Sequence, residues 1–156
     1  MQATGPASLE PLRIHEFFVF ERSGRLLFHR NYANKAQEES IDERGKLVYG
    51  VLFSLKQMIP SLSPPELITE EGIRSLSTKA FTLHSFESAT GYRFAAVTSV
   101  ATAAQQADVR RVLEKVFSQL FVDLVMMDPT YKPGTRIASA VFDGAVVQAF
   151  QTVGVV

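Results

Sequence analysis

Residues 17–20, Phe-Phe-Val-Phe, constrain the fold of this chain more than any other segment. They close a short stretch, residues 13–20 (RIHEFFVF), whose aromatic and β-branched residues favour a strand. Successive side chains of a strand point to opposite faces of a sheet, so a continuous apolar run needs cover on both faces. The sequence therefore predicts an inner strand in a sheet that has other elements packed on each side.

Turn residues divide the rest of the β structure into four further strands. Gly24, in Arg22-Ser23-Gly24-Arg25, can take a positive φ and join the first strand to residues 26–32 as a hairpin. A second hairpin is expected where Gly91 ends the turn 88–91. The remaining strands are predicted at residues 73–77, 81–86 and 92–100. The sheet should therefore have five strands.

Three helices are expected, at residues 41–59, 108–127 and 135–153. Ser40 and Glu43 fit a capping box at the start of the first helix, and Pro60 should end it. Asp108 is the expected cap of the second. The order ββαβββαα predicts an α+β sandwich, an antiparallel meander with helices on both faces. With 156 residues of which 46% are hydrophobic, we expect one domain over residues 13–156, after a flexible tail of residues 1–12.

Composition excludes several classes of partner and site. Sixteen basic and sixteen acidic residues give zero formal charge, and no basic run exceeds two residues, so nucleic acid is not an expected partner. The chain has no cysteine, which excludes disulfides, thiolate metal sites and lipid anchors on cysteine. No signal sequence and no window of roughly 20 apolar residues is present. We therefore expect a cytoplasmic protein without direct membrane insertion.

The first helix carries more apolar surface than one core needs. Its predicted core stripe, at helical spacing, is Val48, Val51, Leu52, Leu55 and Ile59. At about 100° per residue, Tyr49 and Phe53 fall outside that stripe, where solvent is expected. These two aromatic side chains are therefore candidates for contact with a binding partner.

The second helix shows the same excess. Its predicted core stripe is Val109, Leu113, Val116, Leu120 and Leu124. Phe121, Val122, Val125 and Met126 project elsewhere, and a helix that is apolar on all sides is buried on all sides. Either a partner or the third helix must cover them, and for Val122 and Met126 the two alternatives are equally good.

Markers of catalysis are few. His15, His29 and His84 all fall in predicted strands and lack the spacing of a metal site, so hydrogen-bonded strand histidines are the better interpretation. The sequence contains no nucleophile elbow, no phosphate-binding loop and no dinucleotide fingerprint. We therefore predict no catalytic, cofactor-binding or metal-binding residues and no enzyme activity.

Several segments together resemble the longin-like small subunits of the TRAPP vesicle-tethering complex. They are the opening hairpin at residues 14–24, the helix at residues 46–56 (KLVYGVLFSLK), the hairpin at residues 82–91 and the segment 117–129. The most specific is Tyr49-Gly50-x-Leu52-Phe53-Ser54 followed at this interval by Ser63-Pro64. The tail and the Ala/Gln-rich connection at residues 100–107 depart from the family pattern.

The resemblance implies a fold, a role and a set of contacts. The family's fold is a five-stranded antiparallel sheet with one helix on one face and two on the other. Its members are structural subunits that lie beside other TRAPP subunits, both longin-type and larger lipid-binding-type. The assembly is a guanine nucleotide exchange factor for a Rab-type GTPase in transport between the endoplasmic reticulum and the Golgi. The resemblance thereby implies peripheral localisation at those membranes, with subunit contacts at Tyr49, Phe53, Phe117, Phe121 and Val125.

Two other trafficking classes are alternatives, and the small chains of clathrin adaptors open with a similar hairpin. A small chain of a clathrin or coatomer adaptor, which binds cargo, is the alternative function, but its sequence after the first helix should differ from the hairpin at residues 82–91. A longin-type SNARE is not favoured, because no heptad segment follows the domain. On the favoured hypothesis nucleotide exchange belongs to the assembled complex, and the isolated chain should show none.

Overall fold

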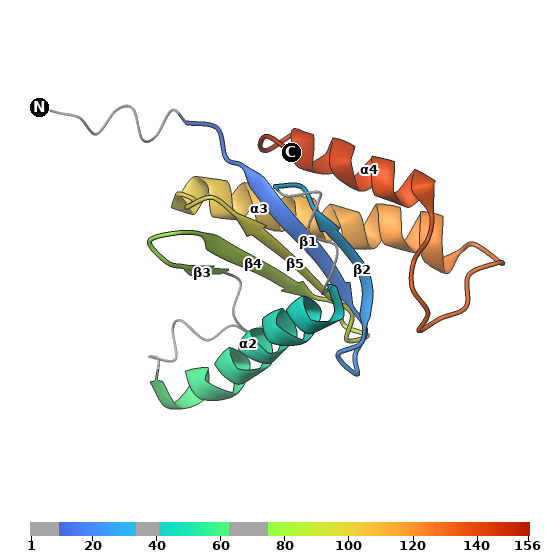
Figure 1. The fold of residues 1–156 in the computed structure, drawn as a ribbon, viewed down its shortest axis with the longest axis horizontal. Coiled ribbons are helices and arrows are strands. Elements are labelled where there is room, and N and C mark those ends of the chain that lie inside the picture. Colours follow the sequence, from blue (N-terminus) through green and yellow to red (C-terminus); the bar gives the residue numbers. More distant parts are fainter. Residues whose placement is uncertain (1–9, 34–40, 63–74) are drawn as a thin grey trace, which may run out of the picture.

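The computed structural model describes residues 10–33, 41–62 and 75–156, and within the first helix the side chains of residues 43–54 and 57. Its elements follow the predicted order (Figure 1). The strands are β1 (Ile14–Phe20), β2 (Leu26–Asn31), β3 (Ser75–Ser77), β4 (Thr82–Glu87) and β5 (Arg93–Thr98). The helices are α2 (Ile41–Leu62), α3 (Ala103–Lys115), η2 (Val116–Met126) and α4 (Ala140–Gln151).

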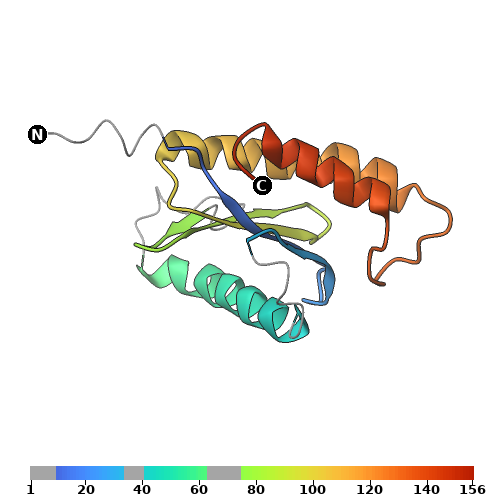
Figure 2. The same cartoon turned by 45° about the horizontal axis from the view of Figure 1, so that its top comes forward.

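The five strands form one antiparallel sheet in the order β2-β1-β5-β4-β3. Helix α2 covers one face, and α3, η2 and α4 cover the other (Figure 2). The predicted α+β architecture, with one helix layer on one face and two helices side by side on the other, is confirmed. None of the described helices is long and apolar enough to cross a membrane.

Strand β1 lies inside this sandwich, as its continuous apolar run predicts. Phe17, Phe18, Val19 and Phe20 are each 0% exposed. Phe17 and Val19 belong to the core beneath α3, η2 and α4, whereas Phe18 and Phe20 belong to the smaller core beneath α2. The alternation of a strand thus divides four consecutive apolar side chains between two cores.

The folded part of the chain begins before β1. Leu12 is 2% exposed, and its carbonyl oxygen accepts a hydrogen bond from the Val155 amide at 2.7 Å. The Ile14 amide in turn donates to the Val155 carbonyl at 2.8 Å. The C-terminal residues therefore hold the chain in place just before β1, one residue ahead of the predicted boundary at Arg13. Most of the predicted tail lies outside the described residues.

Both predicted hairpins are confirmed, with Gly24 and Gly91 at φ 92° and 94°. Gly24 has a second role, since a Cβ added there would lie 2.8 Å from Cε1 of the Tyr49 ring. The β1–β2 turn and α2 therefore touch at a position that only glycine permits. This contact fixes the orientation of α2 on the sheet.

The helix bounds differ from the predictions for local reasons. Helix α2 runs to Leu62, so Pro60 does not end it. Proline has no backbone N–H, so one i→i−4 hydrogen bond is missing there, but the helix continues for two residues beyond it. The predicted cap at Ser40 lies outside the described residues.

Helix α3 begins five residues before the predicted position. Thr102 is its cap, with the Thr102 hydroxyl accepting from the Gln105 amide and the Gln105 side chain accepting from the Thr102 amide. This reciprocal pair is a capping box with Gln in its last position. Asp108 instead lies inside the helix, where it accepts from Arg111 at 2.7 Å.

Helix α4 begins later than predicted, at Ala140, with the Ser139 hydroxyl accepting from the Phe142 amide at 3.1 Å. Residues 135–139 are not helical because the Ile137 amide donates to the Leu27 carbonyl at 2.8 Å, which holds this segment along the edge of β2. The buried side of α4 is Phe142, Val146, Ala149 and Phe150. Val141, in the first turn of α4, is 67% exposed.

Candidate interaction surface

Helix α2 is the only described helix on its face of the sheet, and a narrow row of side chains attaches it. Leu52 is 5% exposed, and Val48 and Tyr49 pack against the core formed by Phe18 and Phe20. Tyr49 therefore belongs to the row that contacts the sheet, whereas the sequence predicted Val51 for that row. Leu55 and Ile59, the other predicted members, lie outside the described side chains.

Apolar side chains are exposed on both flanks of this row. Leu47 and Val51 lie one turn apart on one flank, 65% and 38% exposed, and Phe53 lies on the other flank, 45% exposed. We call these three side chains the α2 surface. Exposure of Phe53 agrees with the sequence prediction. Exposure of Val51 does not, because the row that contacts the sheet is rotated toward Tyr49 by the contact with Gly24.

Tyr49 connects the α2 surface to the core. Its ring lies 5.5 Å from the Phe20 ring and 6.2 Å from the Phe53 ring, measured between centroids, and is nearly parallel to the latter at 17°. The Arg93 guanidinium lies 5.2 Å from the Tyr49 ring centroid. A cation over an aromatic face is attractive. The Tyr49 ring therefore packs between the core and Phe53, and Phe53 is the more exposed of the two side chains.

The candidate contacts on the second helix have a different environment. Phe121 and Val125 are each 1% exposed, and Phe117 is partly buried against the same core. The Phe121 ring lies 5.0 Å from Tyr92 and 5.5 Å from Phe94. Phe121 and Val125, which the resemblance implies as subunit contacts, are therefore covered within this domain. They are core residues of this domain.

The cause is the geometry of η2, which is a π-helix. In an α-helix the buried stripe through Val116 would continue at Leu120 and Leu124, as the sequence predicts. Because a π-helix bonds i to i+5, the inward row passes instead from Val116 to Phe121. Leu120 and Leu124 become partly buried. The wider turn thus places Phe121 and Val125 on the face that packs against the sheet and α4.

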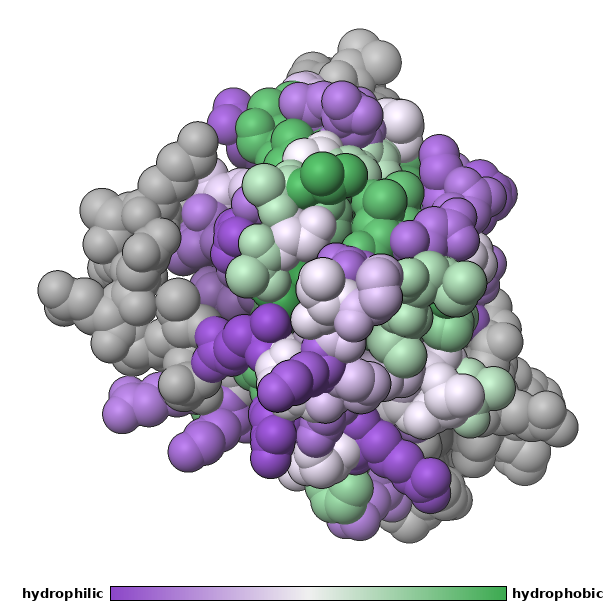
Figure 3. All heavy atoms as spheres, turned by 90° about the vertical axis from the view of Figure 1, so that its right-hand side faces the viewer, coloured by the Kyte–Doolittle hydropathy of each residue, from purple (hydrophilic) through white to green (hydrophobic). Residues whose placement is uncertain are grey.

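Apolar surface remains where η2 ends. Met127 is 71% exposed, Met126 38% and, at the start of α4, Val141 67%. Figure 3 shows hydrophobic side chains gathered on this side of the molecule, with hydrophilic ones around them. The third helix therefore covers Met126 only in part. Val122 is half-buried.

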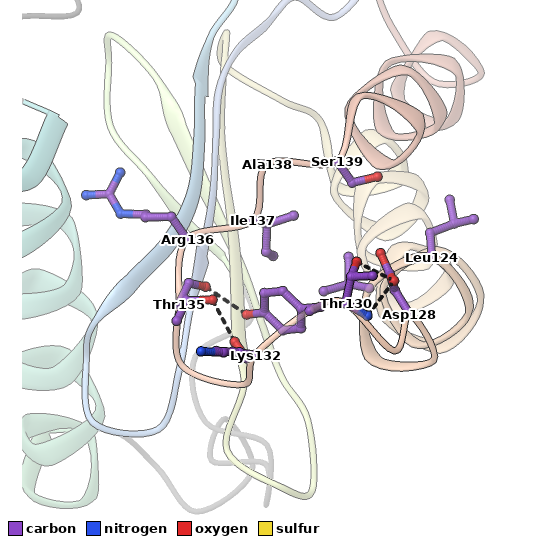
Figure 4. A pocket seen from close by; sticks show the side chains of 11 residues that line it. Leu124, Asp128, Thr130, Lys132, Thr135, Arg136, Ile137, Ala138 and Ser139 are labelled. Atoms are coloured by element: carbon purple, nitrogen blue, oxygen red, sulfur yellow. Dashed lines mark hydrogen bonds between the residues drawn. The ribbon is translucent and has the colours of Figure 1, made fainter.

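A pocket of about 420 Å³ lies next to this patch, between the end of η2 and the loop that leads to α4. Figure 4 shows its lining. The loop is held by its own hydrogen bonds. An Asp128 carboxylate oxygen accepts from the amide and hydroxyl of Thr130 at 2.9 and 2.7 Å, and these bonds lower the pKa of Asp128. The Tyr131 hydroxyl donates to the Thr135 carbonyl at 2.8 Å. The pocket wall is therefore pre-formed, a property of binding surfaces that change little on association.

The three histidines lie in strands, as predicted. His29 Nε2 lies 2.9 Å from Glu16 Oε2, and His84 Nε2 lies 2.8 Å from Thr98 Oγ1. His84 is 1% exposed, and burial lowers its pKa to about 4. Within residues 10–33, 41–62 and 75–156, no group of three or more His, Cys, Asp or Glu residues is arranged to hold a metal ion.

His84 should make the stability of the domain depend on pH. Its pKa is lower in the folded state than the unfolded value of 6.5, so the unfolded chain binds the proton more tightly. The free energy of unfolding that depends on neutral His84 has its full value above pH 6.5 and decreases as the pH falls toward 4. At pH 5 it is lower by about 2 kcal/mol. Denaturant unfolding across this range checks it. His84→Asn should flatten the slope in this window, and an unchanged slope would show that His84 is not the group responsible.

The chain has relatives among characterised proteins. A model of the Sybindin-like family matches residues 14–153. The Trafficking protein particle complex subunit 1 of Dictyostelium discoideum is 30% identical over 129 residues, 83% of this chain and 88% of that protein. The Homo sapiens protein of the same name is 28% identical over 132 residues, 84% of this chain and 87% of that protein. The subunit BET5 of Saccharomyces cerevisiae is 28% identical over 119 residues, 72% of this chain and 71% of that protein. These matches confirm the resemblance seen in the sequence.

Proposed function

Since this chain belongs to the Sybindin-like family, we propose that it is a non-catalytic structural subunit of a TRAPP-type vesicle-tethering complex, of the subunit-one type. The relatives named Trafficking protein particle complex subunit 1 match along most of their length, which supports the proposal. They are particle subunits, which favours this function over the alternative of an adaptor small chain. On this proposal the partners are other TRAPP subunits, longin-type and larger lipid-binding-type.

The observation that carries the proposal is the α2 surface. A folded domain of this size covers most of its large apolar side chains, yet Leu47, Val51 and Phe53 lie exposed on one helix. Fully burying such a side chain contributes about 1.5–3 kcal/mol, so a neighbouring subunit gains by covering them. Leu47 with Val51, and Phe53 with Tyr49, each lie one helical turn apart and form two apolar strips along α2. Apolar surface of this kind is typical of a protein-protein interface.

We assign the subunit contacts to Tyr49 and Phe53 on α2, with Phe117 at the edge of the second helix. Phe53 makes the contact directly, whereas Tyr49 fixes the Phe53 ring by stacking beneath it. Phe117 is half-buried and stacks on Phe121, so it presents one edge to a neighbour. The subunit thereby offers a rigid surface on which neighbouring subunits are positioned.

Nucleotide exchange on a Rab-type GTPase is, on this proposal, an activity of the assembly. The chain then lies in the cytoplasm and reaches Golgi and endoplasmic reticulum membranes through its partners. Its role toward the GTPase is to position the elements that open the nucleotide site. The proposal involves no cofactor.

Two measurements test this function. Affinity purification of the tagged chain from its own cells should bring down several other TRAPP-type subunits in fixed proportion. The purified chain alone should leave the rate of nucleotide release from a Rab-type GTPase at its intrinsic value, whereas the purified assembly should raise it. Recovery of the chain as a lone monomer, or exchange by the chain alone, would contradict the proposal.

A further inference from the structure

The chain has four methionines and no cysteine, so its sulfur chemistry is that of thioethers. Two of them, Met126 and Met127, follow each other at the end of η2 and are 38% and 71% exposed. Exposure lets an oxidant reach the sulfur, and a polar sulfoxide is the product. We propose that Met126 is a site of reversible oxidation by peroxide, at which the Tyr92 hydroxyl binds the oxygen of the sulfoxide.

The Tyr92 hydroxyl is directed at this sulfur in the reduced protein. It lies 4.0 Å from Met126 Sδ and donates to it. A thioether sulfur is a weak acceptor, and this contact is long. An oxygen bonded to Sδ and directed at Tyr92 shortens the gap by about one covalent bond, into the range of ordinary O–H···O hydrogen bonds, about 2.5–3.0 Å. The hydroxyl therefore suits the oxidised side chain better than the reduced one.

Tyr92 is held in place by the core and by the turn between β4 and β5. Its ring lies 5.0 Å from the ring of Phe121, a side chain that is 1% exposed. Its amide donates to Ser88 Oγ at 3.0 Å, and its carbonyl accepts from the Ser88 amide at 2.8 Å. A rigid part of the domain thus presents the hydroxyl to Met126.

Space for the oxidant and for the added oxygen lies beside the pair. A pocket of about 660 Å³ has both Tyr92 and Met126 in its lining. The remaining lining residues come from the two hairpin turns and are Glu21, Arg22, Ser23 and Thr90. A peroxide molecule that enters this pocket therefore meets the sulfur and the hydroxyl in the same wall.

The proposed step is an oxygen transfer. A lone pair of Met126 Sδ attacks one oxygen of hydrogen peroxide, so that an S–O bond forms and the O–O bond breaks. The hydroxide that leaves takes the proton of the transferred oxygen and departs as water. The sulfur is oxidised by two electrons and the peroxide is reduced. Methionine sulfoxide reductases, which draw on a thiol reductant, restore the thioether, so the change is reversible.

Oxidation of Met126 would change the surface at this end of the molecule. Met126, Met127 and Val141 are the exposed apolar side chains of the patch in Figure 3. A sulfoxide is polar, so the patch becomes less apolar and less favourable for contact with an apolar partner. The proposal is independent of the subunit role and of the α2 surface, because it uses only the end of η2 and the hairpin turns.

Treatment of the full chain with hydrogen peroxide tests the site, with proteolysis and tandem mass spectrometry measuring the sulfoxide at each position. Sulfoxides form as two epimers, each reduced by its own reductase, so incubating the peptides with either reductase gives the epimer ratio. Because Tyr92 lies to one side of the sulfur, Met126 should form one epimer in about threefold excess or more. Met127, 71% exposed, is the internal control and should form both in similar amounts.

Tyr92→Phe removes the hydroxyl and keeps the ring beside Phe121. This variant should bring the epimer ratio at Met126 to that at Met127, whereas Thr90→Val, which removes another hydroxyl from the same pocket, should leave the excess unchanged. Thermal unfolding verifies the fold of each variant. Oxidation of the unmodified chain in denaturant makes the same comparison without a variant, and there the excess should disappear.

Three results would each overturn the proposal. They are a Met126 that stays reduced while Met127 is oxidised, equal epimers at Met126 in the folded chain, and an excess that persists in folded Tyr92→Phe protein.

Discussion

Phe121→Asp is expected to prevent folding, whereas Phe53→Asp is expected to leave the domain folded and to abolish its assembly with other subunits. Truncating a buried phenylalanine costs about 3–5 kcal/mol. A carboxylate left without a partner in the same place adds several more. Domains of this kind have about 5–15 kcal/mol of stability in total, so the sum is enough to unfold the chain. Phe121 sits among Tyr92, Phe94 and Phe142, and no water reaches it there.

Phe53 differs because it is 45% exposed and keeps only the stack on Tyr49 within the described contacts. Losing that stack costs about 0.5–1.5 kcal/mol, which the domain tolerates. In the free subunit an aspartate at this position remains in water. Covered by another subunit, it would be a buried charge without a partner, so the complex should not form.

Circular dichroism and denaturant unfolding of both purified variants measure the first half of this prediction, and co-purification with other subunits measures the second. Leu47→Asp, on the other flank of α2, should also leave the domain folded, and its effect on co-purification shows whether a partner covers that flank as well. Phe121→Leu is the conservative control and should fold with reduced stability. A folded Phe121→Asp protein would mean that η2 does not bury this ring, and normal assembly of Phe53→Asp would remove the α2 surface from the interface.

The sheet and its layers were predictable because strand signals are local. The run at Phe17–Phe20 and the turns at Gly24 and Gly91 each depend on a few adjacent residues, and together they determine five strands and two covered faces. The capping box at Thr102 and Gln105 is equally local. The sequence nevertheless predicted a cap at Asp108, because an aspartate before an apolar run is the stronger signal.

The face that each helix buries was less predictable. A helical wheel assumes about 3.6 residues per turn, and eleven residues of π-helix in η2 change which positions point inward. In α2 the period is regular, but its rotation is set by the contact of Tyr49 with Gly24, two residues far apart in sequence.

The attachment of α2 leads to the second large effect, at a buried acid that no sequence pattern identified. Glu16 of β1 is 3% exposed and lies 2.9 Å from His29 Nε2 of β2. Arg44 of α2 reaches the same carboxylate, with its Nε donating to Oε1 at 2.7 Å and to Oε2 at 2.6 Å. The network therefore joins the sheet to α2.

Burial by itself raises the pKa of Glu16, but the hydrogen bonds from His29 and Arg44 outweigh it, so the pKa of this carboxyl is lowered. The folded state thus prefers the ionised form. The ionised Glu16 carboxylate stabilises the folded state above pH 4.5, the ordinary pKa of the group. This stabilisation is lost as the pH falls through the lower pKa that Glu16 has in the folded protein. This window lies below that of His84, so the two effects can be separated.

Glu16→Gln should destabilise the domain by about 2–3 kcal/mol at neutral pH, because the neutral amide leaves His29 and Arg44 without a full partner in a buried site. Arg44→Gln is the matched variant and should cost about 1 kcal/mol, since half of the Arg44 side chain is in water already. The difference between Glu16→Gln and the unmodified protein should shrink as the pH falls from 4.5 through the lowered pKa of the folded Glu16 carboxyl, because below that pKa both carry an uncharged side chain.

Urea unfolding measures these free energies, and hydrogen exchange locates the change. If the network holds α2 on the sheet, the amides of α2 should exchange faster in Glu16→Gln while those of α3 and α4 change less. Equal acceleration in all helices would mean that the network supports the domain as a whole. A loss of α2 protection alone would tie the position of Phe53, and with it the subunit contact, to a carboxylate on the other side of the helix.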